Sequence, residues 1–205
     1  MTNISDSNND IYKTISKTSN GFFKDKGSKF YAYAFMVIND DEIQERRNEI
    51  RKKHYDARHH VYAYRIGNEK DTFYASDDGE PANSSGAPIL GQIRSADLTN
   101  ILIIVVRYFG GTKLGIPGLI NAYKTAAYDA INNSKIIKKT IGKEISLKFN
   151  YPLMNNVMRI LKNDDIKILN QKFTENCNIE IEIRKSKYEQ IVSNLKLFKD
   201  LVIEK

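Results

Sequence analysis

Hydrophobic and polar positions follow regular spacings along the chain and predict its main elements. Residues 29–37 alternate and are rich in Tyr and Phe, as half-buried strands are, and residues 59–66 and 73–75 also read as strands. Residues 101–106 are all aliphatic, which predicts a strand buried on both faces. The clearest helix has apolar residues at i, i+3, i+4 and i+7 spacing, namely Leu119, Ala122, Tyr123, Ala126, Ala127, Ala130 and Ile131.

Shorter signals predict the turns and helices between these strands. Residues 25–28 are expected to form a turn. Asn39 and Asp40 suit a helix N-cap, and three basic residues at 51–53 suit the end of that helix. Pro88 is expected to open a short helix.

The pattern changes after about residue 142. Strands are expected near residues 145–149, 166–173, 179–183 and 201–203, with helices at 151–163 and 186–198. The order βαββαβ is that of a ferredoxin-like domain. We therefore predict an α+β protein with a disordered tail at residues 1–10, a first domain at 11–138, a boundary in the basic stretch 135–143, and a ferredoxin-like domain at 143–205.

Composition narrows the class of protein. The chain has 205 residues, 41% hydrophobic and 28% charged, and a net charge of +7 spread over both halves, which is typical of a globular protein and compatible with weak RNA affinity. Its single cysteine, Cys177, excludes an internal disulfide framework and a Cys-based zinc site. The polar N-terminus and the lack of a long apolar run predict a cytoplasmic protein that does not bind membranes.

A glycine-rich segment follows the buried strand and predicts an anion site. Arg107, Gly110, Gly111, Thr112, Lys113 and Gly115 precede a helix, so two cations lie beside backbone N–H groups that glycine leaves free to turn outward. Ile116 and Pro117 stand where a Walker loop needs Lys and Ser/Thr, which excludes that nucleotide-hydrolase motif. A tight turn in which the glycines only relieve crowding is the alternative interpretation.

The motif Arg58-His59-His60 begins a predicted strand. Adjacent strand residues point to opposite faces, so the two imidazoles are not expected to ligate one metal ion. Either histidine is a candidate proton carrier.

Three carboxylates lie close together at Asp77, Asp78 and Glu80. They could coordinate Mg²⁺, pair with Arg58, Arg107 or Lys113, or accept hydrogen bonds from turn amides. We favour the structural uses over a metal site.

These segments together resemble the IMPACT/YigZ family. The resemblance rests on residues 27–30 (GSKF), 57–60 (ARHH), 76–81 (SDDGEP) and 107–115 (RYFGGTKLG), in that order. It implies a first domain like domain IV of elongation factor G, a fold shared with a ribosomal protein, and a ferredoxin-like second domain like domains III and V of that factor. By fold analogy it implies a link to translation or RNA.

Three functional hypotheses follow. The leading one is a non-enzymatic cytoplasmic module, without a cofactor, that binds RNA, the ribosome or translation factors and regulates translation. The second is an enzyme for a phosphorylated or acidic small molecule, with His59 or His60 as proton carrier and Mg²⁺ at the acidic loop. The third is a protein-interaction scaffold without an anion site. The residues expected to contact phosphate or RNA are Arg58, His59, His60, Arg107, Gly110, Gly111, Thr112, Lys113 and Gly115, with Asp77, Asp78 and Glu80 as the supporting acidic loop.

Overall fold

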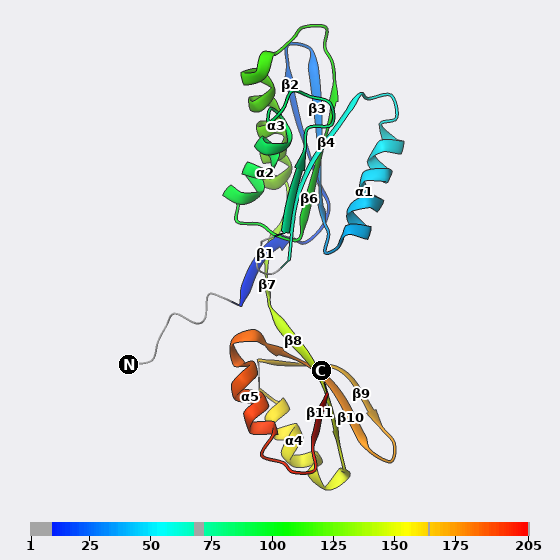
Figure 1. The fold of residues 1–205 in the computed structure, drawn as a ribbon, viewed down its shortest axis with the longest axis vertical. Helices are drawn as coiled ribbons and strands as arrows, with labels where there is room; N and C mark the ends of the chain where they lie inside the picture. The colour runs from blue at the N-terminus through cyan, green and yellow to red at the C-terminus, as the bar shows by residue number, and fades with distance from the viewer. Residues whose placement is uncertain (1–9, 68–71, 164, 205) are drawn as a thin grey trace, which may run out of the picture. The chain divides into compact units, whose positions relative to one another are not determined.

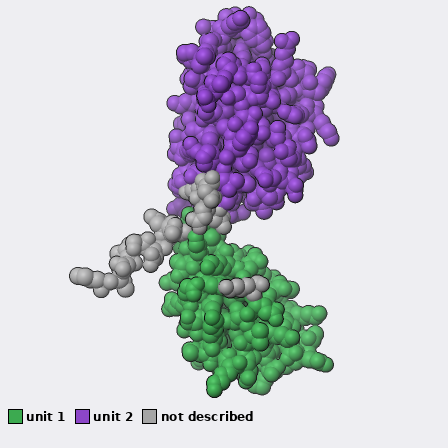
Figure 2. Space-filling model, in the orientation of Figure 1, with its two compact units in different colours: residues 1–11, 140–205 green, residues 12–139 purple. Residues whose placement is uncertain are grey.

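The chain forms two compact units. The computed structural model describes residues 10–67, 72–163 and 165–204. Residues 12–139 make one unit, hereafter the first unit (purple, labelled unit 2 in Figure 2). Residues 140–163 and 165–204 with Asp10 and Ile11 make the described part of the other, hereafter the second unit (green, labelled unit 1 in Figure 2). In the described part of the chain, no helix combines the length and apolar content needed to cross a membrane.

The unit of residues 12–139 is built on a five-stranded sheet with the strand order β2-β3-β6-β4-β5, in which neighbouring strands are antiparallel. Helices α2 and α3 cover one face of the sheet and α1 covers the other (Figure 1). The bounds are β2 Ser19–Asp25, β3 Ser28–Met36, α1 Asp40–Lys53, β4 His59–Ile66, β5 Thr72–Ser76, α2 Gly86–Ser95, β6 Ile101–Tyr108 and α3 Gly115–Asn132.

The central strand β6 confirms the prediction of a strand buried on both faces. Every residue from Ile101 to Arg107 is buried. Ile101, Ile103 and Val105 pack with α2 and α3, whereas the residues between them pack with α1. Arg107 continues the first set, so a charged side chain lies at the end of an apolar row, facing α3.

Local signals for turns and helices are confirmed at several points. Lys26 and Gly27 both have positive φ, 43° and 82°, as a two-residue hairpin turn between β2 and β3 requires. The side chain of Asn39 accepts a hydrogen bond from the Glu42 N–H at the start of α1. The buried stripe of α3 consists of the seven residues that the spacing predicts. Helix α2 begins at Gly86, two residues before Pro88.

The predicted tail needs correction at its end, whereas the predicted boundary in the stretch 135–143 agrees with the division between the two units at residues 139 and 140. Residues 1–9 lie outside the described part, but Asp10 is 1% exposed and its side chain accepts hydrogen bonds from Arg184 and Ser186. The basic stretch 135–143 holds strand β7 (Ile136–Thr140), which pairs with β1 (Ile11–Ile15). Exposed Ile136, Lys138 and Thr140 alternate with partly buried Ile137 and Lys139, so this part of the stretch is a strand.

The second unit has the predicted βαββαβ element order. Its four-stranded sheet has the order β11-β8-β10-β9, and helices α4 and α5 pack against one face. Each helix is preceded by a 3₁₀ turn. The bounds are β8 Gly142–Phe149, η1 Tyr151–Leu153, α4 Met154–Leu161, β9 Ile166–Phe173, β10 Cys177–Arg184, η2 Lys185–Lys187, α5 Tyr188–Leu195 and β11 Val202–Glu204.

Candidate functional site

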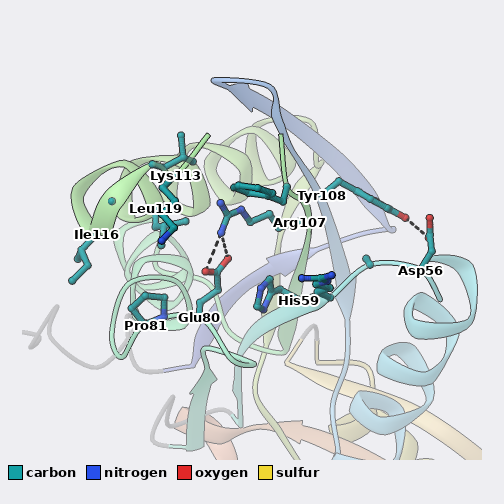
Figure 3. A pocket seen from close by; sticks show the side chains of 14 residues that line it. Asp56, His59, Glu80, Pro81, Arg107, Tyr108, Lys113, Ile116 and Leu119 are labelled. Atoms are coloured by element: carbon teal, nitrogen blue, oxygen red, sulfur yellow. Dashed lines mark hydrogen bonds and ion pairs between the residues drawn. The ribbon is translucent and has the colours of Figure 1, made fainter. Parts of the chain in front are cut away.

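Three of the motifs singled out in the sequence meet at one end of the five-stranded sheet. They line a pocket of about 740 Å³, hereafter the motif pocket (Figure 3). The start of β4 supplies one wall, the acidic loop a second, and the segment from the end of β6 into α3 a third. The lining residues are Asp56, Ala57, Arg58, His59, Glu80, Pro81, Arg107, Tyr108, Phe109, Lys113, Leu114, Gly115, Ile116 and Leu119.

A buried ion pair lies in the wall of the motif pocket. Arg107 Nη1 donates to both carboxylate oxygens of Glu80, at 2.7 and 3.0 Å (Figure 3). The Tyr123 hydroxyl donates to the same carboxylate at 2.7 Å. The two charged side chains are only 8% and 4% exposed. Burial and the neighbouring Glu80 carboxylate raise the pKa of Tyr123 far above its ordinary value. Glu80 therefore neutralises the Arg107 guanidinium within the wall of the pocket.

The guanidinium of Arg107 also lies close to two aromatic rings. Its central carbon is 5.6 Å from the ring centroid of Phe30 and 5.7 Å from that of Phe109. The Phe109 side chain is 59% exposed, so it covers the buried ion pair on one side and offers a free ring surface on the other.

Two members of the predicted anion cradle have partners within the protein itself. Arg107 was expected to face a ligand, and its Nη1 instead binds Glu80. The Gly110 N–H donates to Ser28 Oγ at 3.1 Å, and a Cβ at Gly110 would collide with the backbone of Gly27 and Ser28. Gly110 is thus required for a close backbone approach, which is the steric interpretation of the glycines.

Two exposed cations remain at the motif pocket. Arg58 and Lys113 both line it, and neither forms an ion pair with any residue that the structure describes. Gly111 and Gly115 have φ of +90° and +69°, which only glycine adopts readily, and together with Thr112 they keep the loop around Lys113 exposed. Of the predicted residues in this part of the site, Arg58, Lys113 and Gly115 line the pocket, whereas Gly111 and Thr112 are not among its lining residues.

The two adjacent histidines point to opposite faces of the sheet, as strand geometry requires. His59 lines the motif pocket and donates its Nδ1–H to the Asp78 carbonyl at 2.9 Å, which leaves Nε2 as the acceptor nitrogen. His60 lies on the α1 side, where its Nε2 contacts the His54 carbonyl at 3.0 Å. His60 is therefore not among the residues that line the pocket, and its assignment to the phosphate-binding set gains no support there.

The carboxylates of the acidic loop turn to separate partners. Asp77 Oδ1 accepts from the Ser85 N–H, the Ser85 hydroxyl and the Gly86 N–H, so it caps the start of α2. Asp78 accepts from the His60 N–H and pairs with Arg51. With Glu80 bound to Arg107, the loop performs the structural roles that the sequence favoured. Among the described residues, no group of three or more His, Cys, Asp or Glu side chains could hold a metal ion.

The hydrogen bonds to Asp77 also set its charge. Burial alone raises the pKa of this carboxyl, but the hydrogen bonds from Ser85, Gly86 and Asn83 outweigh burial and lower the pKa below its ordinary value. Asp77 is therefore ionised while it caps α2, which strengthens those hydrogen bonds.

The sequence did not reveal a second polar cluster, on the α1 side of the same sheet end. His54 contacts the Tyr33 hydroxyl at 2.7 Å and the Tyr108 hydroxyl at 2.9 Å, and the Tyr108 hydroxyl donates to Asp56 at 2.8 Å. Figure 3 shows Tyr108 pointing away from Arg107 toward Asp56. Burial and the bond to Asp56 raise the pKa of Tyr108 to about 12. Strand alternation at Arg107 and Tyr108 was the signal that could have found this cluster.

Comparison with known proteins identifies the family. The Impact N-terminal domain family matches residues 26–131, which include all the residues of the motif pocket. This chain belongs to the Impact family. It is 31% identical over 175 residues to an IMPACT family member of Haemophilus influenzae, covering 83% of this chain and 84% of that one. It is 33% identical over 143 residues to the IMPACT family member YigZ of Escherichia coli, covering 67% and 70%.

A solved structure resembles nearly the whole of this Impact family member. It is a crystal structure of a hypothetical protein, with a TM-score of 0.70 and 25% identity, and the likeness covers 95% of this chain and 97% of that chain. The mixed α/β architecture of both units is therefore shared with that protein.

Proposed function

We propose that this Impact family member is a non-enzymatic cytoplasmic module that binds RNA, alone or on the ribosome, and thereby regulates translation. The observation that carries the proposal is the motif pocket, which has exposed Arg58 and Lys113, an exposed ring at Phe109, and apolar lining from Leu114, Ile116 and Leu119. A nucleotide of RNA has the complementary parts, a phosphate and a flat base.

The charges of the pocket favour positioning contacts over sequence readout. Arg58 and Lys113 are the cations left for phosphate, since Glu80 neutralises Arg107. Contacts to phosphate hold RNA in place without reading its sequence. We therefore expect affinity that depends on salt and little on base identity.

The finer fold assignments belong to the same proposal. We infer that residues 12–139 resemble domain IV of elongation factor G and that the second unit is a ferredoxin-like domain. The element order βαββαβ and the strand order β11-β8-β10-β9 support the second assignment. Both folds occur in a translation factor, and this likeness supports the proposed link to translation by analogy.

RNA binding by a charge-removal variant tests the proposal. Fluorescence anisotropy with a labelled RNA hairpin bearing a single-stranded end, and co-sedimentation with ribosomes, would compare wild type with Arg58→Ala/Lys113→Ala. We expect affinity to fall about tenfold or more. The slope of log affinity against log salt concentration should also become shallower, by the equivalent of about two phosphate contacts. The control Lys17→Ala/Lys124→Ala removes the same charge from exposed positions outside the pocket.

Two results would count against the proposal. If the wild-type protein binds neither RNA nor ribosomes at low salt, the third hypothesis, a scaffold without an anion site, replaces it. If the Arg58→Ala/Lys113→Ala variant binds as tightly as the control, RNA contacts some other surface.

One observation favours a second candidate, an enzyme for a phosphorylated or acidic small molecule. His59 has its Nδ1–H held by the Asp78 carbonyl, so Nε2 is available as a proton acceptor in the pocket wall. The Mg²⁺ site of that hypothesis loses its support, because Asp77, Asp78 and Glu80 face different partners. Turnover of a phosphorylated compound that His59→Gln abolishes while binding persists would establish the enzyme.

A further inference from the structure

Helix α1 covers its face of the sheet only in part, and an aromatic surface lies beyond it. Tyr33 and Phe35 of β3 are buried with Ile43 and Ile50 of α1. Nearer the β2–β3 turn, Phe22 is 47% exposed, and Tyr31 and Tyr108 are half-buried. We call Phe22, Lys24, Lys29, Tyr31 and Tyr108 the aromatic face.

The rings of the aromatic face hold one another in place. The ring centroid of Tyr31 lies 5.1 Å from that of Phe22 and 5.9 Å from that of Tyr108. The Tyr31 ring also stacks on the His54 ring, with 5.8 Å between the ring centroids and an interplanar angle of 28°. Hydrogen bonds to Tyr33 and Tyr108 fix the His54 ring in turn. The rings are therefore held in place before any ligand binds. A nucleic-acid base that stacked on this preorganised surface would cost little side-chain entropy.

Two exposed lysines give the aromatic face a positive charge that attracts anions. Lys24 and Lys29 are direct partners across the β2–β3 pair, and both are exposed. Like charges directly opposite each other destabilise a sheet. Neither lysine forms an ion pair with a residue in the described ranges. A bound phosphate would relieve this repulsion.

The aromatic face continues into the motif pocket. A depression of about 480 Å³ contains Lys29, Tyr31, His54 and Gly27, and its remaining lining residues are Asp56, Tyr108 and Phe109. Those last three also line the motif pocket. The carboxylate there, Asp56, is engaged by the Tyr108 hydroxyl. One extended strand of nucleic acid can therefore pass around the end of β6, from the lysines of the aromatic face to Arg58 and Lys113.

We propose that the aromatic face binds single-stranded RNA by stacking unpaired bases on Phe22 and Tyr31, with phosphates at Lys24 and Lys29. The proposal rests on the RNA-binding function above and adds a second surface on the opposite face of the sheet. Exposed rings beside cations on open strands suit unpaired bases, because bases in a duplex hide their flat faces. The surface should be tolerant of sequence, since every base can stack.

Anisotropy with a labelled single-stranded RNA and the matching duplex tests the proposal. The variants are Phe22→Ala and Lys24→Gln/Lys29→Gln, each checked for an unchanged thermal unfolding curve. For single-stranded RNA, we expect Phe22→Ala to weaken binding about 5- to 100-fold and the lysine pair to reduce the salt dependence. Tyr128→Ala and Lys17→Gln/Lys124→Gln, at exposed positions outside the aromatic face, are matched controls that should bind like wild type.

The outcomes separate this inference from the proposed function. If wild type binds RNA and Arg58→Ala/Lys113→Ala weakens binding, but the aromatic-face variants bind like the controls, the aromatic face is not an RNA surface and the proposed function stands. If duplex binds as tightly as single strand and Phe22→Ala is neutral, stacking is overturned even where the lysines contribute. If wild type binds no RNA, the proposed function itself has failed.

Discussion

The two units bury their sheets in different ways. In residues 12–139 the central strand β6 is buried on both faces, and its last buried residue, Arg107, needs Glu80 as a partner. In the second unit β10 alternates, with Cys177, Ile179, Ile181 and Ile183 in the core and the residues between them at least partly exposed. The polar side chains of that sheet can reach water on its open face, whereas those at the end of β6 must be satisfied by other side chains. The motif pocket lies where this requirement brings distant polar residues together.

Each unit also has an ion pair that joins segments distant in the chain. Glu80 and Arg107 are both almost fully buried, at 4% and 8% exposed. Asp10 and Arg184 are 174 positions apart, and there the arginine is 27% exposed. If burial determines how much such an ion pair contributes to stability, removing the carboxylate should lower the free energy of unfolding more in the first unit than in the second.

The largest expected effect is that of Glu80→Ala. This change leaves the Arg107 guanidinium buried and unpaired and removes the acceptor of the Tyr123 hydroxyl. We expect the free energy of unfolding of residues 12–139 to fall by about 3–5 kcal/mol. Urea denaturation followed by tyrosine fluorescence would measure it.

A double variant tests whether the unpaired charge is the cause. Glu80→Leu/Arg107→Leu removes both charges, and we expect it to be less destabilised than Glu80→Ala, because no buried charge remains. Equal destabilisation of the two variants would show that packing, and not charge, dominates at this position.

A smaller effect is expected for Asp10→Ala. The Asp10 carboxylate accepts from the Ser186 N–H at 2.9 Å and Arg184 Nε at 3.1 Å, so its removal leaves a backbone donor without its partner. We expect a loss of about 1–3 kcal/mol, confined to the second unit. Hydrogen exchange measured by mass spectrometry would locate the loss. Faster exchange throughout β6 would contradict this confinement.

The smallest expected effect is a pH dependence of the first unit. Burial lowers the pKa of His54 and of His60 below the ordinary value of 6.5, with further lowering from nearby cations such as Lys53 at His54. The unfolded chain then binds protons more readily than the folded one, so stability is full above pH 6.5 and decreases as pH falls below it.

This pH dependence can be checked by NMR titration of the histidine ring protons and by urea midpoints between neutral pH and about pH 5. His54→Gln should lessen the decrease in stability. A titration midpoint for His54 above 6.5 would mean that the ring gains a proton on folding, which reverses the sign.

Much of the fold could be read from the chain because the signals are local. The spacing in α3 predicted its buried residues, the aliphatic run predicted β6, and Asn39 predicted the cap of α1. Strand β7 was missed because the lysines at 138 and 139 resemble a linker, although its pairing with β1 explains why those residues are extended.

The sequence predicted several of the residues that belong to the site, but not how they contact one another. The motifs did indicate that Arg58, Lys113 and Glu80 belong near one another, and they line one pocket. They left open whether the acidic loop pairs with Arg58, Arg107 or Lys113, and they did not indicate that Gly110 packs on Gly27. His54 and Tyr108 gave little signal, since each is an ordinary residue until the fold brings them within hydrogen-bonding distance.

The sequence by itself determined where strands, helices and turns begin and which motifs could carry charge, because periodicity, caps and glycine conformations act between residues a few positions apart. Only the tertiary structure decided which charges remain open. Ion pairing depends on distance in space, and Glu80 reaches Arg107 from 27 positions away, which leaves Arg58 and Lys113 as the exposed cations of the motif pocket.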